Sequence, residues 1–247
     1  MNSVCIFQAH TLYNSVYART NGNETFQERA FTLQTEYWGE NSNLIFTEQQ
    51  KITHDLLGEL ETIRVSYREE IKSIEQFVNH FESESVQPGV RQEFYEMMKS
   101  ISLSCSQFMG EFTGRIIQES VQLLNITPPC EFDAVAIGSL ARGEATPYSD
   151  LEYLFLVEKD TPETIQYFEM LAITSYFLIG NLAETKLSYM AIEELQGWFH
   201  DTSRNGFKID GLLEGARNIP TGYGSEAKQN HFIVTPQELA DRYQRIL

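Results

Sequence analysis

Ala136-Ile137-Gly138-Ser139-Leu140-Ala141-Arg142-Gly143-Glu144-Ala145-Thr146-Pro147-Tyr148-Ser149-Asp150-Leu151-Glu152-Tyr153-Leu154 is the stretch that decides the fold. It predicts a strand that ends in Gly-Ser, then a helical turn, then a second strand that opens with Asp-x-Glu. Side chains two residues apart on a strand share a face, so Asp150 and Glu152 are expected to project together. Two adjacent carboxylates repel each other, which makes them a poor structural choice and a good cage for a divalent metal ion.

The same stretch predicts a nucleotide site. Magnesium is usually held by one or two carboxylates together with the phosphates of its substrate, and paired ions steady in-line phosphoryl or nucleotidyl displacement. Gly138 lets the backbone approach a phosphate, and Ser139 offers a hydroxyl and an amide at the start of a helix. Arg142, one turn later, can reach the same polyphosphate with its guanidinium group.

An acidic-x-acidic pair alone is weak evidence in a chain with 35 acidic residues, and other such pairs occur, for example Glu59/Glu61 and Glu82/Glu84. Asp150/Glu152 differs because it lies in a strand context with a Gly-Ser turn upstream. This combination resembles the nucleotidyltransferase superfamily of DNA polymerase beta. The longer pattern Gly-Ser-x-x-Arg-Gly-Glu-x-x-x-x-Ser-Asp-x-Glu is similar to PII uridylyltransferases, glutamine synthetase adenylyltransferases and their relatives of unknown substrate.

The resemblance implies a third carboxylate on a later strand, and Asp210 in Gly206-Phe207-Lys208-Ile209-Asp210-Gly211 matches it, with Glu184 as the competing candidate. Asp150, Glu152 and Asp210 would then be both catalytic residues and metal ligands for Mg²⁺ or Mn²⁺. The expected nucleoside triphosphate contacts are Gly138, Ser139, Arg142 and Ser149, with Lys208, Arg217 and Lys228 as weaker candidates whose simpler role is surface solvation.

Two departures from the family pattern stand out. Glu152 occupies a position where Asp is more frequent. The segment after Asp210 reads Gly211-Leu212-Leu213-Glu214-Gly215, where the adenylyltransferases have Arg-Leu-Arg-Pro. The resemblance therefore does not carry over their substrate.

The first half of the chain has a helical period. Apolar side chains spaced by threes and fours predict long helices over about 47–85 and 90–125, with a shorter helix over 24–37. Thr47 and Gln50 form a capping-box pattern at the start of the first long helix. Two such helices joined by a short turn predict an antiparallel hairpin. The row of apolar side chains along each helix, its apolar stripe, is interpreted first as part of the core. A partner-binding or dimerising surface is the alternative.

Strands alternate with helices after Pro129. The sequence predicts a buried strand over 132–137, a strand over 151–157, helices over 162–179 and 191–200, and a strand over 207–212. A last helix opens at Thr235-Pro236. The predicted fold is an α/β (α+β) nucleotidyltransferase domain with a mixed sheet, residues 130–247, preceded by a mostly helical region, residues 1–129.

Composition limits the partners. The 247-residue chain carries 18 basic and 35 acidic side chains, a net charge of −17. Stable nucleic-acid binding needs a basic surface, so no nucleic-acid partner is expected. Three widely separated cysteines fit a reducing compartment, and the absence of a long apolar run or a signal-like start favours a cytoplasmic protein away from membranes.

These observations favour a metal-dependent nucleotidyltransferase that moves a nucleoside monophosphate to a hydroxyl of a protein or small molecule. The alternatives are a nucleotide-sensing or partner-binding module with the same fold and no turnover, and a purely structural helical protein.

Overall fold

The computed structural model describes residues 13, 24–38, 46–74, 88–182, 220 and 232–244. In chain order the elements are α2 (Glu24–Trp38), α3 (Phe46–Ser73), α5 (Pro88–Leu124), β1 (Phe132–Ala136), α6 (Gly138–Ala141), β2 (Tyr153–Val157), α7 (Pro162–Asn181), β3 (Ile233–Val234) and α9 (Pro236–Gln244). The chain is thus rich in helix and carries a small sheet, as an α+β architecture requires.

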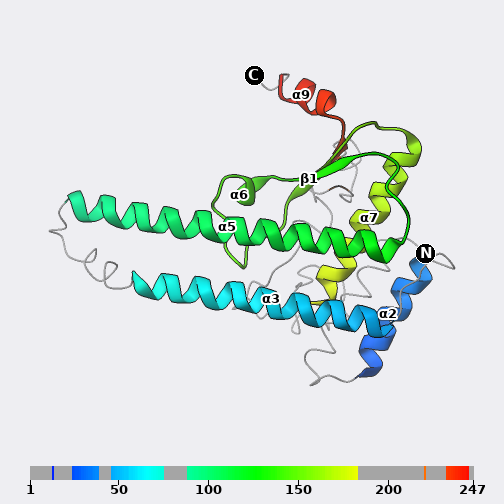
Figure 1. Cartoon of the computed structure of the whole chain (residues 1–247), viewed down its shortest axis with the longest axis horizontal. Coiled ribbons are helices and arrows are strands. Elements are labelled where there is room, and N and C mark those ends of the chain that lie inside the picture. Colours follow the sequence, from blue (N-terminus) through cyan, green and yellow to red (C-terminus); the bar gives the residue numbers. More distant parts are fainter. Residues whose placement is uncertain are drawn as a thin grey trace, which may run out of the picture.

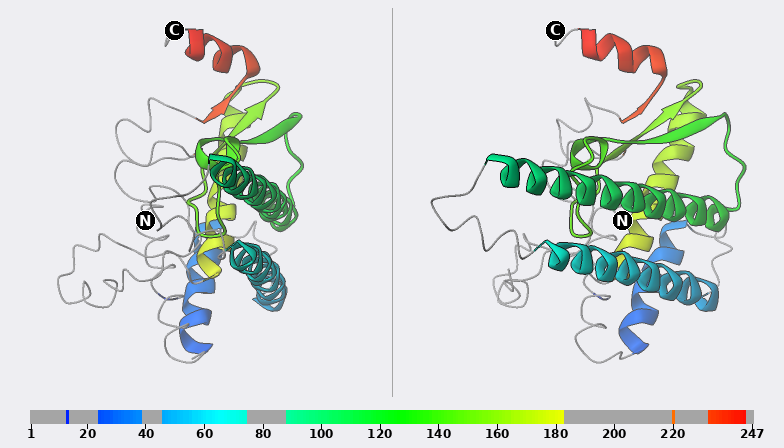
Figure 2. Two further views of the ribbon diagram at one scale, coloured as in Figure 1. Left: turned by 90° about the vertical axis from the view of Figure 1, so that its left-hand side faces the viewer. Right: turned by 60° about the vertical axis from the view of Figure 1, so that its left-hand side comes forward.

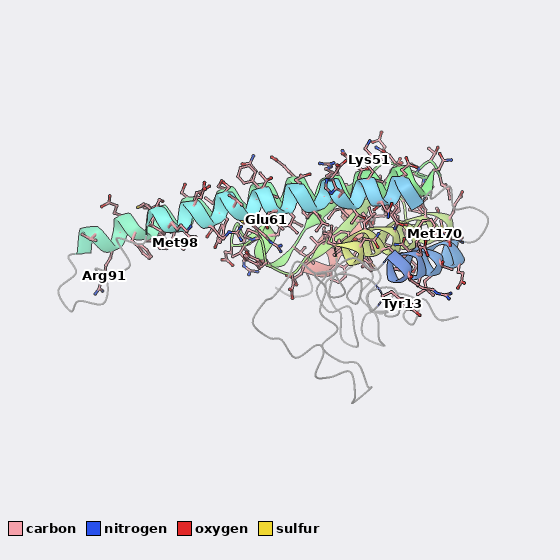
Figure 3. All side chains as sticks on the ribbon, turned by 90° about the horizontal axis from the view of Figure 1, so that it is seen from below. Tyr13, Lys51, Glu61, Arg91, Met98 and Met170 are labelled. Carbon is pink, nitrogen blue, oxygen red and sulfur yellow. The ribbon has the colours of Figure 1, made fainter. Side chains whose placement is uncertain are left out.

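Helices α3 and α5 lie side by side and run in opposite directions, which Figures 1 and 2 show from three sides. Their predicted stripes are buried: α3 contributes Leu56 and Leu60, and α5 contributes Cys105 and Phe112. The N-terminal end of α5, where Figure 3 labels Arg91, extends past the end of α3. The stripes therefore serve as core, while the predicted hairpin turn lies outside the described residues and stays a prediction.

Helix α3 is shorter than predicted. It ends at Ser73, and the Ile74 amide donates to the Ile71 carbonyl at 3.1 Å in a closing turn. The prediction of one continuous helix to about residue 85 is therefore wrong at Ser73, where the apolar period supplies no stop signal, and residues 75–85 lie outside the described residues. Helix α3 also begins at Phe46, which places Thr47 inside its first turn instead of at its cap.

The sheet has the order β1-β2-β3. Strands β1 and β2 pair antiparallel, from Phe132 opposite Val157 to Ala136 opposite Tyr153, whereas β3 pairs parallel to β2. The sheet is therefore mixed, as predicted, and β3 is a strand that the sequence did not indicate. Two residues are too few for a periodic pattern to be visible.

Helix α7 crosses α5 and covers the sheet (Figures 1 and 2). Its Phe168 ring lies 4.8 Å from that of Phe132 on β1 and 5.2 Å from that of Phe155 on β2, centroid to centroid. These are the separations that favourable aromatic pairs adopt. One buried cluster includes side chains of α3, α5, β2, α7 and β3, so the core is continuous across residue 129. The division into two domains at that residue stays a prediction.

Helices α7 and α9 each begin with a side-chain cap at the N-terminus. Thr161 caps α7 by accepting from the Thr164 amide at 3.3 Å, with Pro162 at the first helical position. At α9 the Thr235 amide donates to the Glu238 carboxylate at 2.9 Å, and the Glu238 amide donates to the Thr235 hydroxyl at 3.3 Å. This reciprocal pair is a capping box. The predicted helices over 24–37 and 162–179 and the start at Pro236 are confirmed.

Strand β1 is less buried than predicted. Asp133, Ala134 and Val135 are exposed, and the strand lies at the edge of the sheet that the structure describes. The prediction of a buried strand over 132–137 is wrong in this respect, because a short apolar run does not distinguish an edge strand from a central one. Strand β2 begins at Tyr153, and Leu151 forms only an isolated bridge before it.

Several predictions fall on residues outside the described ranges. They are the helix over 191–200, the strand over 207–212, and the positions of Cys5, Glu184, Lys208, Asp210, Arg217 and Lys228. Within the described ranges, none of the helices combines the length and the apolar character needed to cross a membrane.

Candidate functional site

The motif begins where β1 ends beside the start of β2. Ala136 lies opposite Tyr153, and the next amide along β1, that of Ile137, donates to the Glu152 carbonyl at 3.1 Å. Gly138 and Ser139 follow directly in α6. The antiparallel register therefore brings the Gly-Ser turn and Glu152, which are separated in sequence, to the same end of the strand pair.

Gly138 is in close contact with Glu152. Its φ is +60°, in the left-handed region, and a Cβ added to it would overlap Oε2 of Glu152 and lie 2.6 Å from Cδ. The direction in which a side chain would project is thus occupied by a carboxylate. Glycine is needed here for its backbone conformation and for this close approach, whereas the sequence suggested only the approach of a phosphate.

Helix α6 is a single turn between two glycines. The Arg142 amide donates to the Gly138 carbonyl at 3.2 Å, and the Glu144 amide donates to the Ser139 carbonyl at 2.9 Å. Gly143 has a φ of +71°, and a Cβ there would lie 2.5 Å from a methyl group of Leu103 on α5. The turn is therefore closed by backbone bonds and held close to α5.

Arg142 pairs with Glu144 in this structure. The distance from Nε to Oε2 is 2.8 Å, and the two side chains are 61% and 60% exposed. An exposed ion pair of this kind contributes about 0–1 kcal/mol, so the guanidinium group can exchange its partner at little cost. The sequence predicted a triphosphate contact for Arg142, and that role stays a prediction.

Asp150 follows a closed turn. The Thr146 amide donates to the Ser149 hydroxyl at 2.9 Å, and the Ser149 amide donates to the Thr146 carbonyl at 3.0 Å. The hydroxyl of Ser149 therefore closes the turn, a role that its place in the motif did not indicate. Asp150 and Glu152 are both half-buried, and Leu151 between them is buried at 3% exposure. This alternation agrees with the predicted projection of the two carboxylates.

A buried hydroxyl group lies next along the chain. Tyr153 on β2 is fully buried, and this burial raises the pKa of its hydroxyl, while the neighbouring hydroxyl groups of Ser175 and Tyr176 lower it by less. The Ser175 hydroxyl also donates to that of Ser120 on α5 at 3.0 Å. Tyr153 therefore holds the start of β2 in the buried cluster that α5 and α7 share.

Two side chains of the helical half also reach the motif. Ser106 on α5 accepts a hydrogen bond from the Ala145 amide at 2.9 Å. Arg64 on α3 donates from Nη2 to the Pro147 carbonyl at 3.4 Å. The sequence gave no sign of either contact, because each residue lies on a helix with no motif around it and comes from 39 or 83 positions away.

The predicted third carboxylate is not tested by this geometry, since Asp210 and its competitor Glu184 lie outside the described residues. In the part of the chain that the structure does describe, no three His, Cys, Asp or Glu side chains are grouped so as to hold a metal ion. Of the three carboxylates that the sequence predicted, the structure describes Asp150 and Glu152. One or two carboxylates completed by phosphate oxygens suffice for magnesium.

Comparison with known proteins agrees with the motif. Residues 87–183 match the model of a family described as "Putative nucleotidyltransferase DUF294". The match covers α5, both strands of the antiparallel pair and α7, and so includes the whole Gly-Ser to Asp-x-Glu stretch. No curated protein and no solved structure gives a match to the chain. This segment is therefore similar to a nucleotidyltransferase family, and the likeness to the PII uridylyltransferase branch stays a prediction.

Proposed function

We propose that the protein is a metal-dependent nucleotidyltransferase that transfers a nucleoside monophosphate from a nucleoside triphosphate to a hydroxyl group. The observation that carries the proposal is the contact between Gly138 and Glu152 at the end of the β1/β2 pair. It joins the glycine and one acid of the motif in space, within the segment that resembles a nucleotidyltransferase family.

The donor set suits magnesium or manganese. Asp150 and Glu152 offer hard carboxylate oxygens from half-buried positions, and Asp210 is the proposed third ligand. A bound divalent ion would neutralise phosphate charge and favour in-line displacement at the α-phosphorus. The protein's own contribution would be to present the two carboxylates from the segment just before β2 and to keep the Gly138 backbone against the carboxylate of Glu152.

The chain's other motif residues would bind the triphosphate. Ser139 lies half-buried in the turn after β1, and Arg142 is available once it leaves Glu144. The acceptor oxygen forms a bond to the α-phosphorus as the bond to the β-phosphate bridging oxygen breaks, and pyrophosphate leaves. Asp210 would take the proton that the acceptor hydroxyl loses. Ser149 contributes by closing the turn before Asp150.

We infer that the acceptor is a protein side chain or a small molecule. A net charge of −17 disfavours a polyanionic acceptor such as RNA or DNA, because binding to a phosphate backbone depends on lysine and arginine. Binding of a protein or small-molecule hydroxyl does not require a surface rich in lysine and arginine.

The test is label transfer. The protein is incubated with each α-labelled ribonucleoside triphosphate, with Mg²⁺ or Mn²⁺ and with a lysate as the source of acceptors. The Asp150→Ala variant is the control. Transfer that the variant loses supports the proposal. Tight triphosphate binding with no transfer and no pyrophosphate release, under all conditions, overturns it in favour of a nucleotide-sensing module.

A further inference from the structure

The turn before Asp150 is held by both long helices. On α5, Ser106 is buried and its hydroxyl accepts from the Ala145 amide at 2.9 Å. On α3, Arg64 is buried, donates to the Pro147 carbonyl at 3.4 Å, and places its guanidinium carbon 4.6 Å from the centroid of the Tyr148 ring. Three residues of one short segment, Ala145, Pro147 and Tyr148, thus contact the helical half of the chain.

The segment is closed on itself by hydrogen bonds. Between Thr146 and Ser149 the chain makes a hydrogen bond from amide to hydroxyl at 2.9 Å and one from amide to carbonyl at 3.0 Å. The Tyr148 amide also donates to the Thr146 hydroxyl at 3.3 Å. A contact that fixes any part of this turn therefore fixes its end, and Asp150 is the next residue.

Burial makes the Arg64 contact informative. Arginine is almost never fully buried unless its charge is satisfied, and an apolar residue often fills such a place at no loss of stability. Arg68, one turn later on the same helix, shows the ordinary alternative: it is exposed and pairs with Glu61 at 2.6 Å. The contacts of the Arg64 guanidinium group include a carbonyl and an aromatic face of the turn, two interactions for which its planar geometry is suited.

We propose that Arg64 and Ser106 are positioning residues of the candidate site: they hold the turn 145–149 against α3 and α5 and thereby set the position of Asp150. The inference rests on the proposed function, since it gives the helical half the task of aligning a metal ligand. It also predicts that a shift of α3 or α5 moves the turn 145–149 and, with it, Asp150.

The first experiment needs no ligand. Hydrogen exchange is measured over a peptide spanning 143–150 in the wild-type chain and in Arg64→Met and Ser106→Ala. Lys51→Met on α3 and Ser104→Ala on α5 are the controls, since the structure gives neither side chain a contact with the turn. We expect exchange in this peptide to rise on the order of tenfold in the first two variants, as the loss of one buried hydrogen bond implies, and to stay at the wild-type rate in the controls.

The second experiment measures the metal site. Binding of Mn²⁺ in the presence of the triphosphate that the wild type binds most tightly is followed by the electron paramagnetic resonance signal of free Mn²⁺. A residue that orients a metal ligand typically contributes 10- to 100-fold in metal affinity, so a loss of about tenfold or more is expected in Arg64→Met and Ser106→Ala. Thermal unfolding of every variant shows whether a loss of stability accounts for the effect.

The outcomes separate the two ideas. Unchanged exchange over 143–150 in both variants overturns the positioning role, whatever the metal affinity. Faster exchange with unchanged Mn²⁺ affinity overturns the link to Asp150. If the wild type binds no Mn²⁺ with any triphosphate, the proposed function fails and the link to a metal ligand fails with it, while the exchange data still decide whether the two residues hold the turn.

Discussion

Replacing Gly138 with alanine tests the closest contact in the candidate site. Its φ of +60° costs an L-residue about 1–2 kcal/mol, and the smaller entropy of the unfolded alanine chain returns about 0.4–1 kcal/mol. The added Cβ would overlap the end of the Glu152 side chain, which is flexible and can rotate away. We therefore expect a net loss of about 1 kcal/mol in the free energy of unfolding, which lowers Tm by about 2–4 °C at this chain length.

The larger effect is expected on metal binding. Rotation of Glu152 removes one of the two described carboxylates from its place, and disturbing the orientation of a ligand typically costs 10- to 100-fold in metal affinity. The assay is Mn²⁺ binding in the presence of a nucleoside triphosphate, with thermal unfolding measured on the same samples. In Gly138→Ala/Glu152→Asp the shorter acid makes room for the methyl group, so part of the affinity should return.

Gly143 is the matched control because it has the same backbone requirement, with φ at +71°, but its added Cβ meets Leu103 and no acidic side chain. Gly143→Ala should lose comparable stability and keep most of its metal affinity. Equal losses of affinity in both variants would show that backbone strain, and not displacement of Glu152, is the cause. Wild-type affinity in Gly138→Ala would refute the reasoning outright.

Three further predictions concern the site and the core. Asp150→Asn should remove Mn²⁺-dependent triphosphate binding while the circular dichroism spectrum stays that of the wild type, and retained binding would exclude Asp150 as a ligand. Phe112→Ala, at a fully buried position, should lower the free energy of unfolding by about 3–5 kcal/mol in a denaturant titration, whereas Phe108→Ala, with its side chain 42% exposed, should cost much less. Burial raises the pKa of Tyr167 from its ordinary value of 10.0 to about 12. Because the unfolded chain then releases this proton first, stability should fall as pH rises from about 10 to 12, and Tyr167→Phe should make that fall shallower.

The helices were the most predictable part of the fold. Periods of three and four apolar residues are local, so α2, α5 and α7 could be found from sequence to within a few residues. The end of α3 at Ser73 could not, because the chain supplies no glycine or proline there. Exposure of β1 and the existence of β3 depend on which strands pair, and a short apolar run carries no information on its neighbours.

For the candidate site, the linear sequence was enough to select Gly138, Ser139, Asp150 and Glu152, because their spacing across a strand, a turn and a strand is a local pattern. Only the tertiary structure decided that the Glu152 carboxylate lies against Gly138, since that contact depends on the antiparallel register of β1 and β2. It alone also revealed the contacts of Arg64 and Ser106 with the turn before Asp150. Such contacts join residues far apart in the chain, and they form only when helices pack, which no short-range pattern of residues encodes.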